Sequence, residues 1–389
     1  MAVGTVVIST LAFVDDLLDM SENAQDAEKA NLRALAFALL KKLLFNSEGK
    51  CKGMLVNKKM GDLQPRMFIR DKNIEFFSYV NYLGDIFQHN GKNSELVKDR
   101  LNRGLRVMLK IETILAEIEF GIHTIEVSLL LYRALFLSSI LFNSQGWRNF
   151  SKSDFSQLQS LQLRLLKKVV GAPSSISSPF LFLELGVLPM KYEIHQRQIT
   201  FLHHIVNLSD EDPVRLLYEN MKRLPFEQNW LKDVLTSAAE YSIDIEEQTL
   251  RSVSKEAFKS KVKSAISHHA FQKLKEECLS QSKTKDLVFT KFEKQPYLTH
   301  LYPSQAKIIL QCRAKCLKIK DHRPFQFKNK ICRWCNLEEE TVDHIVNCIS
   351  DEKVTPVCIN NLDQLNQSVE CTLVSFATRI INFLDMVDY

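Results

Sequence analysis

Two adjacent aspartates near the N-terminus are the first residues in the sequence that could carry out catalysis. Asp15 and Asp16 interrupt an apolar stretch that spans residues 11–20. Carboxylates among hydrophobic residues need a partner charge or a metal ion, and carboxylates hold the two Mg²⁺ ions of a nucleotidyl-transfer site. Aspartate is also a common turn residue, so the same pair is typical of a polar hairpin turn. These residues alone leave both interpretations open.

A second pattern, near the C-terminus, has the residue types and spacing of a metal site. It reads Cys-x₂-Cys-x₈-His-x₃-Cys and comprises Cys332, Cys335, His344 and Cys348. Three thiolates and one imidazole complete a tetrahedron around zinc, which predicts a structural rather than a catalytic site. The alternative is a chance grouping in a cysteine-rich chain. Nearby basic residues could offset the net charge of −1 and remain available to phosphates: Arg323, Lys328, Lys330 and Arg333.

The other cysteines show no second metal pattern. The chain has nine cysteines and no recognisable export signal, which favours reduced thiols or metal ligands over disulfides. Cys312 and Cys316 stand one helical turn apart and could bind a metal. No second pair lies at a suitable distance, so we interpret them as buried free thiols.

Short strands and one helix are predicted to position the aspartates. Residues 6–11 are rich in β-branched side chains and predict a strand. Asp15 and Asp16 would then lie at a hairpin tip between buried strands. Residues 23–44 carry apolar side chains at helical spacing. Lys50 follows a turn-like segment after this helix, and residues 54–56 predict another strand.

Amphipathic helices are predicted over most of the remaining chain. Residues 93–119 predict one long helix on which Arg103, Arg106 and Lys110 fall close to one face. That spacing could follow a phosphate backbone, and a merely solvated face is the alternative. Further helices, interpreted as packing elements without chemistry, are predicted at 124–142, 151–170, up to residue 205, 304–320 and 372–386.

The order of these features resembles the palm of reverse transcriptases from non-LTR (LINE-type) retrotransposons. The resemblance rests on the Phe-Val-Asp-Asp stretch, on Lys50 after its turn, and on the Tyr-Leu-Gly triplet that contains Tyr82 and Gly84. It implies that Asp15 and Asp16 are catalytic metal ligands and that Lys50 takes the position of the family's lysine. It also implies that Tyr82 and Gly84 belong to a primer-grip hairpin, where glycine allows close approach of the backbone.

The resemblance extends beyond the palm. The helix over 93–119 would be the first thumb helix, which in this family contacts the template–primer duplex. The family also places a Cys-Cys-His-Cys knuckle beyond the thumb, which implies a structural zinc ion and a nucleic-acid contact through Arg333. The implied partners are an RNA template and a DNA primer or target, with dNTP as the only small-molecule substrate. Magnesium is implied only where the palm is complete.

Charge is distributed unevenly along the chain. Residues 251–330 contain nineteen Lys or Arg and six Asp or Glu, a net charge of +13, whereas the whole chain carries +5. The rest of the chain therefore carries −8. A basic block in a mildly acidic protein predicts a polyanionic partner, and a set of solvated helical faces is the alternative.

Length and composition predict a folded, mostly helical α+β protein of several domains, because 45% of the 389 residues are hydrophobic and glycine and proline are few. No window is apolar enough over enough residues to predict a membrane span. The N-terminus lacks the basic start and the cleavage site of a signal peptide. We therefore expect an intracellular protein, nuclear or cytoplasmic, without a membrane partner.

Five consecutive segments are predicted: a partial palm (1–90), a helical thumb and post-thumb bundle (91–223), a basic helical connector (224–300), a helix with the zinc knuckle (301–350) and a tail helix (351–389). Fourteen residues precede Asp15, which leaves no room for the family's fingers or third palm carboxylate. We therefore expect a truncated, C-terminal half of an RNA-directed DNA polymerase that is inactive alone. The alternative is a non-catalytic nucleic-acid-binding protein derived from such an element.

Overall fold

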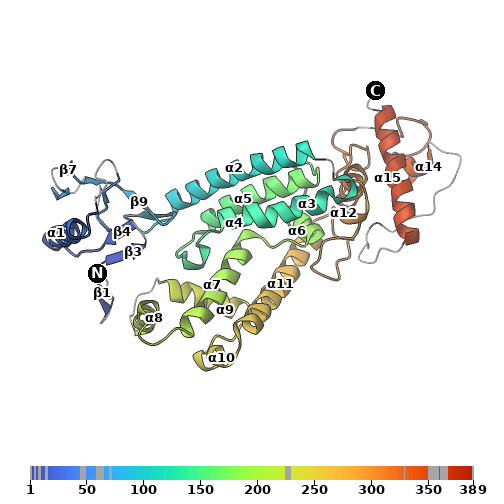
Figure 1. The fold of residues 1–389 in the computed structure, drawn as a ribbon. Coiled ribbons are helices and arrows are strands. Elements are labelled where there is room, and N and C mark those ends of the chain that lie inside the picture. The colour runs from blue at the N-terminus through green and yellow to red at the C-terminus, as the bar shows by residue number, and fades with distance from the viewer. Residues whose placement is uncertain are drawn as a thin grey trace. The chain divides into compact units, whose positions relative to one another are not determined.

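Helices dominate the fold, which confirms the mostly helical α+β class (Figure 1). The structure, a computed structural model, describes the chain except residues 1, 4–5, 8–9, 14–15, 44–49, 58–64, 70–71, 119, 224–228, 328, 349–358, 360–366 and 388–389. The chain divides into two compact units. Unit 1 comprises Met1–Asn102, Asn143–Gln157 and Ile194–Val262, and unit 2 comprises Arg103–Phe142, Leu158–Glu193 and Lys263–Tyr389.

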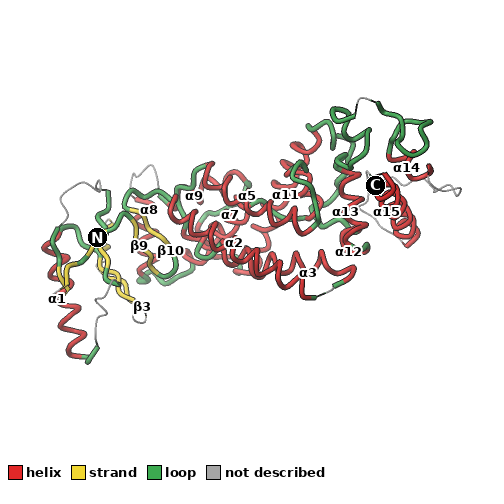
Figure 2. The backbone as a smooth tube through the Cα atoms, turned by 90° about the horizontal axis from the view of Figure 1, so that it is seen from above, coloured by secondary structure: helices red, strands yellow, loops and turns green. Residues whose placement is uncertain are grey.

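The named strands all belong to the first part of unit 1, where Figure 2 draws them in yellow. Every sheet among the described residues has two strands. The antiparallel pairs are β1 (Ala2–Val3) with β2 (Val6–Val7), β3 (Thr10–Phe13) with β4 (Asp16–Asp19), β6 (Phe68–Ile69) with β7 (Lys72–Asn73), and β9 (Tyr79–Tyr82) with β10 (Asp85–Gln88). The parallel pair is β5 (Lys52–Gly53) with β8 (Glu75–Phe76).

The hairpin predicted at the two aspartates is confirmed, but its strands are not buried. Phe13 of β3 lies opposite Asp16 of β4. Every residue of β3 is exposed, and the Phe13 side chain is 60% exposed. A two-stranded sheet has too little surface to bury its own apolar residues. The strand predicted at 54–56 is wrong, because β5 ends at Gly53.

The helix predicted over 23–44 is α1 (Ala24–Leu40). It begins where the Asn23 side chain accepts a hydrogen bond from the backbone amide of Asp26 at 2.9 Å, which satisfies one free donor of the first turn. Ala38 is its only buried residue. The spacing of apolar residues therefore predicted the helix correctly, but the helix has no buried apolar face.

The hairpin of β9 and β10 leads directly into the long helix α2 (Ser94–Glu117). Leu83 and Gly84 at its tip both have positive φ angles, of 49° and 82°, as a two-residue hairpin turn with the native twist requires. The side-chain oxygen of Gln88 accepts the backbone amide of Glu95 at 2.9 Å. This bond caps α2 and ties the hairpin to its first turn. The helix predicted over 93–119 is confirmed.

The remainder of unit 1 is mostly helical and includes the segment 143–150, which begins with η3 (Ser144–Gly146). Trp147 is buried, stacks on Phe150 with ring centroids 4.9 Å apart, and accepts a hydrogen bond from Gln198 at its carbonyl. The helices in this part of unit 1 are the C-terminal part of α7 (Met190–Val206), α8 (Pro213–Arg223), α9 (Trp230–Glu240), α10 (Glu247–Ser252) and the start of α11 (Lys255–Leu279).

Unit 2 contains most of the predicted packing helices. They are η1 (Gly121–His123), α3 (Thr124–Leu131), the π-helical turn η2 (Tyr132–Leu137), α4 (Ser138–Ile140), the part of α5 (Lys152–Val169) from Leu158 on, α6 (Ser178–Leu185), α12 (Tyr297–His300), α13 (Pro303–Arg313), α14 (Val342–Cys348) and α15 (Gln367–Val387). The predictions at 124–142 and 151–170 are confirmed, although the first contains the π turn. The prediction at 304–320 is too long, since α13 ends at Arg313, and α15 begins before residue 372.

Two buried polar groups hold unit 2 together. Gln162 of α5 donates to the hydroxyl of Tyr132 and to the carbonyl of Leu188, and its own oxygen accepts the amide of Met190. Glu184 of α6 pairs with Arg313 at 2.8 Å, and neither side chain is exposed. Buried polar groups of this kind are stable only when their partners are present, so both fix the packing of α5, α6 and α13.

One described stretch, residues 121–140, is long and apolar enough to cross a membrane by length and composition alone. This corrects the expectation of no such window. About a third of the stretch is buried within the protein, and core helices of water-soluble proteins meet the same criterion. It is therefore weak evidence for a membrane span.

Candidate metal centre and basic helix surface

The four predicted metal ligands come together in unit 2. The ligand atoms of Cys332, Cys335, His344 and Cys348 all lie within 4.8 Å of one another. The sulfurs of Cys332 and Cys348 are 3.9 Å apart, and Cys335 Sγ is 3.3 Å from His344 Nε2. Sulfur atoms at tetrahedral angles around one zinc ion lie about 3.8 Å apart. The donor set and its spacing therefore fit a zinc ion with no coordination position left open.

The first two cysteines lie on a tight turn whose backbone faces the sulfurs. The amide of Trp334 points to Cys332 Sγ and the amide of Leu337 points to Cys335 Sγ, each at 3.4 Å. The backbone amides of Glu338 and Leu337 lower the pKa of the Cys335 thiol to about 6. Backbone amides aimed at a sulfur favour the thiolate that a metal binds.

The last two ligands lie on the short helix α14. Thr341 begins this helix, and its hydroxyl accepts the amide of His344 at 3.1 Å. Partial burial raises the pKa of the Cys348 thiol to about 12. The helix places His344 and Cys348 one turn apart, so both side chains reach the same point. A bound cation would favour the Cys348 thiolate against its burial.

A carboxylate outside the predicted ligand set orients the histidine. His344 Nδ1 lies 3.0 Å from Glu338 Oε2, while its Nε2 faces Cys335. A hydrogen on Nδ1 that is donated to Glu338 leaves Nε2 free for a metal, as in other carboxylate–histidine–metal arrangements. The sequence analysis missed Glu338. The available signal was an acidic residue six positions before the histidine.

Arg333, predicted as a phosphate contact, bonds to other residues of the knuckle segment. Its guanidinium bonds to both carboxylate oxygens of the fully buried Glu340 and to the carbonyl of Lys318 at 2.9 Å. It also lies over the ring of Phe327. Burial of Glu340 requires this partner, so Arg333 holds the knuckle to the preceding loop.

The other basic residues near the knuckle differ in availability. Lys330 is exposed. Arg323 donates from Nε to the carbonyl of Leu317 at 3.1 Å, and Lys328 lies outside the described residues. The offsetting charges predicted from the sequence are therefore only partly free to meet a phosphate.

Only one of the two predicted palm aspartates belongs to the described residues, so the metal site predicted there stays a prediction. Asp15 lies outside them. Asp16 is exposed at the start of β4, and Lys50 is exposed in the chain before β5. The Cys-Cys-His-Cys set is the only group of three or more metal-ligating side chains within the described part of the chain. A magnesium site therefore has no support there.

The predicted thumb residues lie on α2 with different exposures. Arg106 and Lys110 are exposed, and Arg103 is half-buried. All three follow the primer-grip hairpin predicted at Tyr82 and Gly84, which is the β9–β10 hairpin described above. Tyr82 is half-buried at its end.

The sequence analysis missed a fourth basic residue of α2. Arg100 is completely buried, bonds to the carboxylate of Asp85, and donates to the carbonyl of Gly84 at 3.2 Å and to Asp99 at 3.0 Å. Partial burial raises the pKa of Asp85, although the Arg100 charge opposes this. Arg100 thus fixes the backbone at the hairpin tip.

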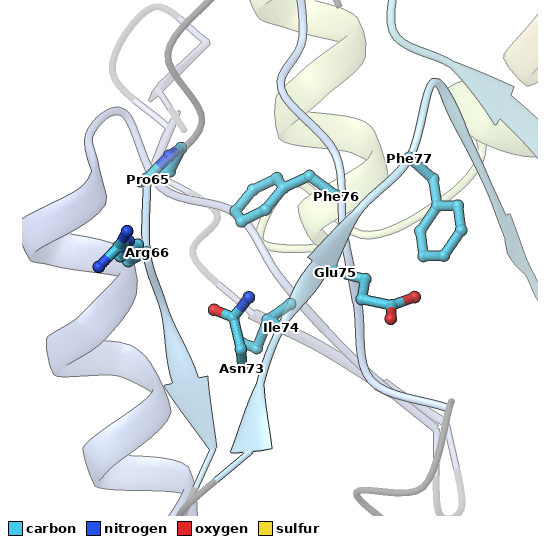
Figure 3. Close-up of a pocket in the computed structure, with 7 residues that line it drawn as sticks. All are labelled: Pro65, Arg66, Asn73, Ile74, Glu75, Phe76 and Phe77. Atoms are coloured by element: carbon cyan, nitrogen blue, oxygen red, sulfur yellow. The ribbon is translucent and has the colours of Figure 1, made fainter.

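An open hollow of about 440 Å³ lies beside the short strands of unit 1, and Figure 3 shows its lining. The ring of Phe76 turns toward Pro65, whereas the Glu75 carboxylate and the Phe77 ring point away from Arg66. No set of acid, base or nucleophile converges among the residues that line it. This hollow is therefore not the candidate site.

Comparisons with known protein families, with curated proteins and with solved structures find no match for this chain.

Proposed function

We propose that this chain is the part of a non-LTR reverse transcriptase that runs from the palm hairpin to the zinc knuckle, and that it binds template–primer nucleic acid. The observation that carries the proposal is the order of the elements. An aspartate hairpin is followed by a positive-φ Tyr-Leu-Gly hairpin that runs into a long basic helix, and a Cys-Cys-His-Cys centre follows later.

In this proposal α2 supplies the main phosphate contact. Arg106 and Lys110 are exposed one helical turn apart, and Arg103 precedes them by one turn. Cations at this spacing can neutralise consecutive phosphates and release their counterions. The zinc centre has a structural role, since it fixes a short segment that has little core of its own.

Binding without catalysis is the second candidate, and one observation favours it. Asp16 is exposed and belongs to no group of three metal-ligating side chains among the described residues. Primer extension with Mg²⁺ that disappears in Asp16→Asn would favour the polymerase. Intact template–primer binding without any extension would favour the binding protein.

The salt dependence of binding tests the proposal. We expect the affinity for a primed RNA template, measured by fluorescence anisotropy, to fall steeply with salt. Replacing Arg103, Arg106 and Lys110 together by Gln should lower the slope of log K against log salt by about two to three.

The matched control replaces three exposed lysines outside α2, Lys92, Lys152 and Lys232. This control should leave the slope nearly unchanged. An equal fall in slope for both triple variants would show that total charge, and not the α2 face, determines binding.

A further inference from the structure

The short helix α14 connects the candidate metal centre to the C-terminal helix α15. Two of the four ligands, His344 and Cys348, lie on one side of α14. Val346 lies about 200° around the helix from His344, on the opposite side. Ile345 and Val346 are 0% and 3% exposed. The helix α14 therefore offers ligands to a metal on one side and packs into the protein on the other.

The helix α15 packs against two other helices, α13 and α14 (Figure 2). On the α13 side, the Gln305 amide donates a hydrogen bond to the Thr378 hydroxyl at 3.5 Å. On the α14 side, Arg379 donates to the carbonyl of Val346 at 3.1 Å. Because Thr378 and Arg379 are adjacent residues of α15, substitutions at these positions can separate its contact with α13 from its contact with α14.

The apolar residues of α15 depend on these neighbouring helices for their burial. Five of its apolar side chains are at most 4% exposed and repeat at helical spacing: Leu373, Phe376, Ala377, Ile380 and Phe383. Loss of one supporting helix would expose part of this apolar face to water, which is unfavourable.

The helix α14 is too short to be stable by itself. It has seven residues, and isolated helices of this length do not persist in water. Arg379 bonds to one of its last four carbonyls, which no amide within the helix can satisfy. On the opposite side, a zinc ion would hold α14 through His344 and Cys348. The order of α14 therefore depends on both the metal and α15.

We propose that zinc occupancy controls the docking of α15, so that the metal centre acts as a latch for the C-terminal helix. The zinc ion and Arg379 hold the same short helix from opposite sides. Each favours the conformation of α14 that the other binds, and such coupling is reciprocal. The inference rests on the zinc assignment and goes beyond the proposed nucleic-acid binding.

Hydrogen exchange of the full chain, followed by mass spectrometry, tests the latch without any substitution. The zinc-loaded chain is compared with the same chain after removal of the metal by EDTA. We expect the amides of α14 and α15 to exchange about tenfold faster after chelation, within the usual range of coupling between two sites. The amides of α9, in unit 1, should exchange at an unchanged rate.

Reciprocity gives a second test, in which α15 is changed and zinc affinity is measured by competition with a chromophoric chelator. Arg379→Met removes the bond to Val346 and should weaken zinc binding about fivefold or more. Thr378→Val is the matched control, because it changes the adjacent residue, whose hydroxyl bonds toward α13. This control should bind zinc like the original chain.

The outcomes separate the latch from the metal assignment. Equal exchange of α15 with and without bound zinc would overturn the latch and leave the zinc assignment standing. Equal losses of zinc affinity in Arg379→Met and Thr378→Val would also contradict it, because the contact with α14 would then have no special role. Absence of zinc from the original chain would instead refute the metal assignment on which the latch rests.

Discussion

Two hydrogen bonds orient His344, one at its backbone amide and one at its ring. The Thr341 hydroxyl accepts a hydrogen bond from the backbone amide of His344. The Glu338 carboxylate lies 3.0 Å from Nδ1 of the His344 ring. Such outer partners fix which ring nitrogen faces the metal and commonly change metal affinity 10- to 100-fold. Glu338 is therefore as much a part of the site as its four ligands.

We predict that Glu338→Ala weakens zinc binding by about 10- to 100-fold without abolishing it. The reason is that His344 loses the acceptor that orients Nε2. Competition with a chromophoric chelator measures the change. Glu339→Ala is the matched control, because this exposed neighbour has no bond to His344, and it should bind zinc like the original chain. Equal affinities for both variants would contradict the orienting role of Glu338.

Sequence could predict the ligands but not their supports. The Cys-x₂-Cys turn and the His-x₃-Cys helix are local, so spacing alone places each pair of side chains together. Arg333 pairs with Glu340, and this pairing depends on the burial of Glu340. Burial is determined by tertiary packing, which the spacing of residues in the sequence does not reveal. The bonds from Arg333 to Glu340 could not be predicted for that reason, and its phosphate role stays a prediction.

At the scale of elements, the first turns of α2 hold the β9–β10 hairpin. Gln88 caps the helix, and Arg100 reaches back to Asp85 and the Gly84 carbonyl. Removing one partner of a buried ion pair leaves an uncompensated charge and costs about 3–5 kcal/mol. The hairpin and the helix should therefore unfold together.

We predict that Arg100→Met lowers the free energy of unfolding by about 3 kcal/mol. Arg106→Met changes an exposed position on the same helix and should stay within about 0.5 kcal/mol. Asp85→Asn combined with Arg100→Met should recover part of the loss, because the side chain at position 85 then carries no charge that lacks a partner. Urea denaturation followed by tryptophan fluorescence measures all three. A loss for Arg106→Met as large as for Arg100→Met would contradict this account.

Helices were the most predictable elements, because apolar residues at a period of 3.6 specify them locally. Three details depended on packing instead. The sequence gives no clear local sign of the π turn at Tyr132–Leu137 or of the end of α13 at Arg313. The strand expected at 54–56 failed because β5 is only two residues long and exists through its pairing with β8.

At the scale of the whole molecule, fewer charged side chains are available at the surface than the sequence contains, because some of them form ion pairs or other bonds within the protein. Arg313 belongs to the basic block 251–330, yet it is buried against Glu184. Arg323 of the same block bonds to a backbone carbonyl. The net charge of +13 counts every charged residue of the block. The positive charge that is available to a polyanion at the surface is smaller, because side chains such as Arg313 are buried in ion pairs. Only the structure separates the two.

A cluster of charged side chains around Glu247 in unit 1 predicts that stability depends on pH. Partial burial alone would raise the pKa of Glu247, but bonds from Lys222, Arg215 and Arg251 outweigh it and lower this pKa to about 2. A carboxyl with a lowered pKa in the folded state adds stability that is present above its ordinary pKa near 4.5 and is lost as the pH falls toward 2.

We predict that Glu247→Gln destabilises the chain at pH 7 and flattens the fall of thermal stability between pH 4.5 and pH 2. Glu246→Gln changes the adjacent exposed carboxylate and should keep the original pH profile. Thermal denaturation at a series of pH values measures both. The same slope for all three chains would show that Glu247 does not couple folding to protonation.

The central claim is that Cys332, Cys335, His344 and Cys348 hold one zinc ion, and elemental analysis of purified variants tests it most directly. We expect one zinc per chain in the original sequence, because the four ligand atoms lie within 4.8 Å of one another. Cys335→Ser and His344→Ala should lose the metal. Cys312→Ser, which changes a buried cysteine outside the cluster, should keep it. Zinc retained in both ligand variants, or lost in Cys312→Ser, would contradict the assignment.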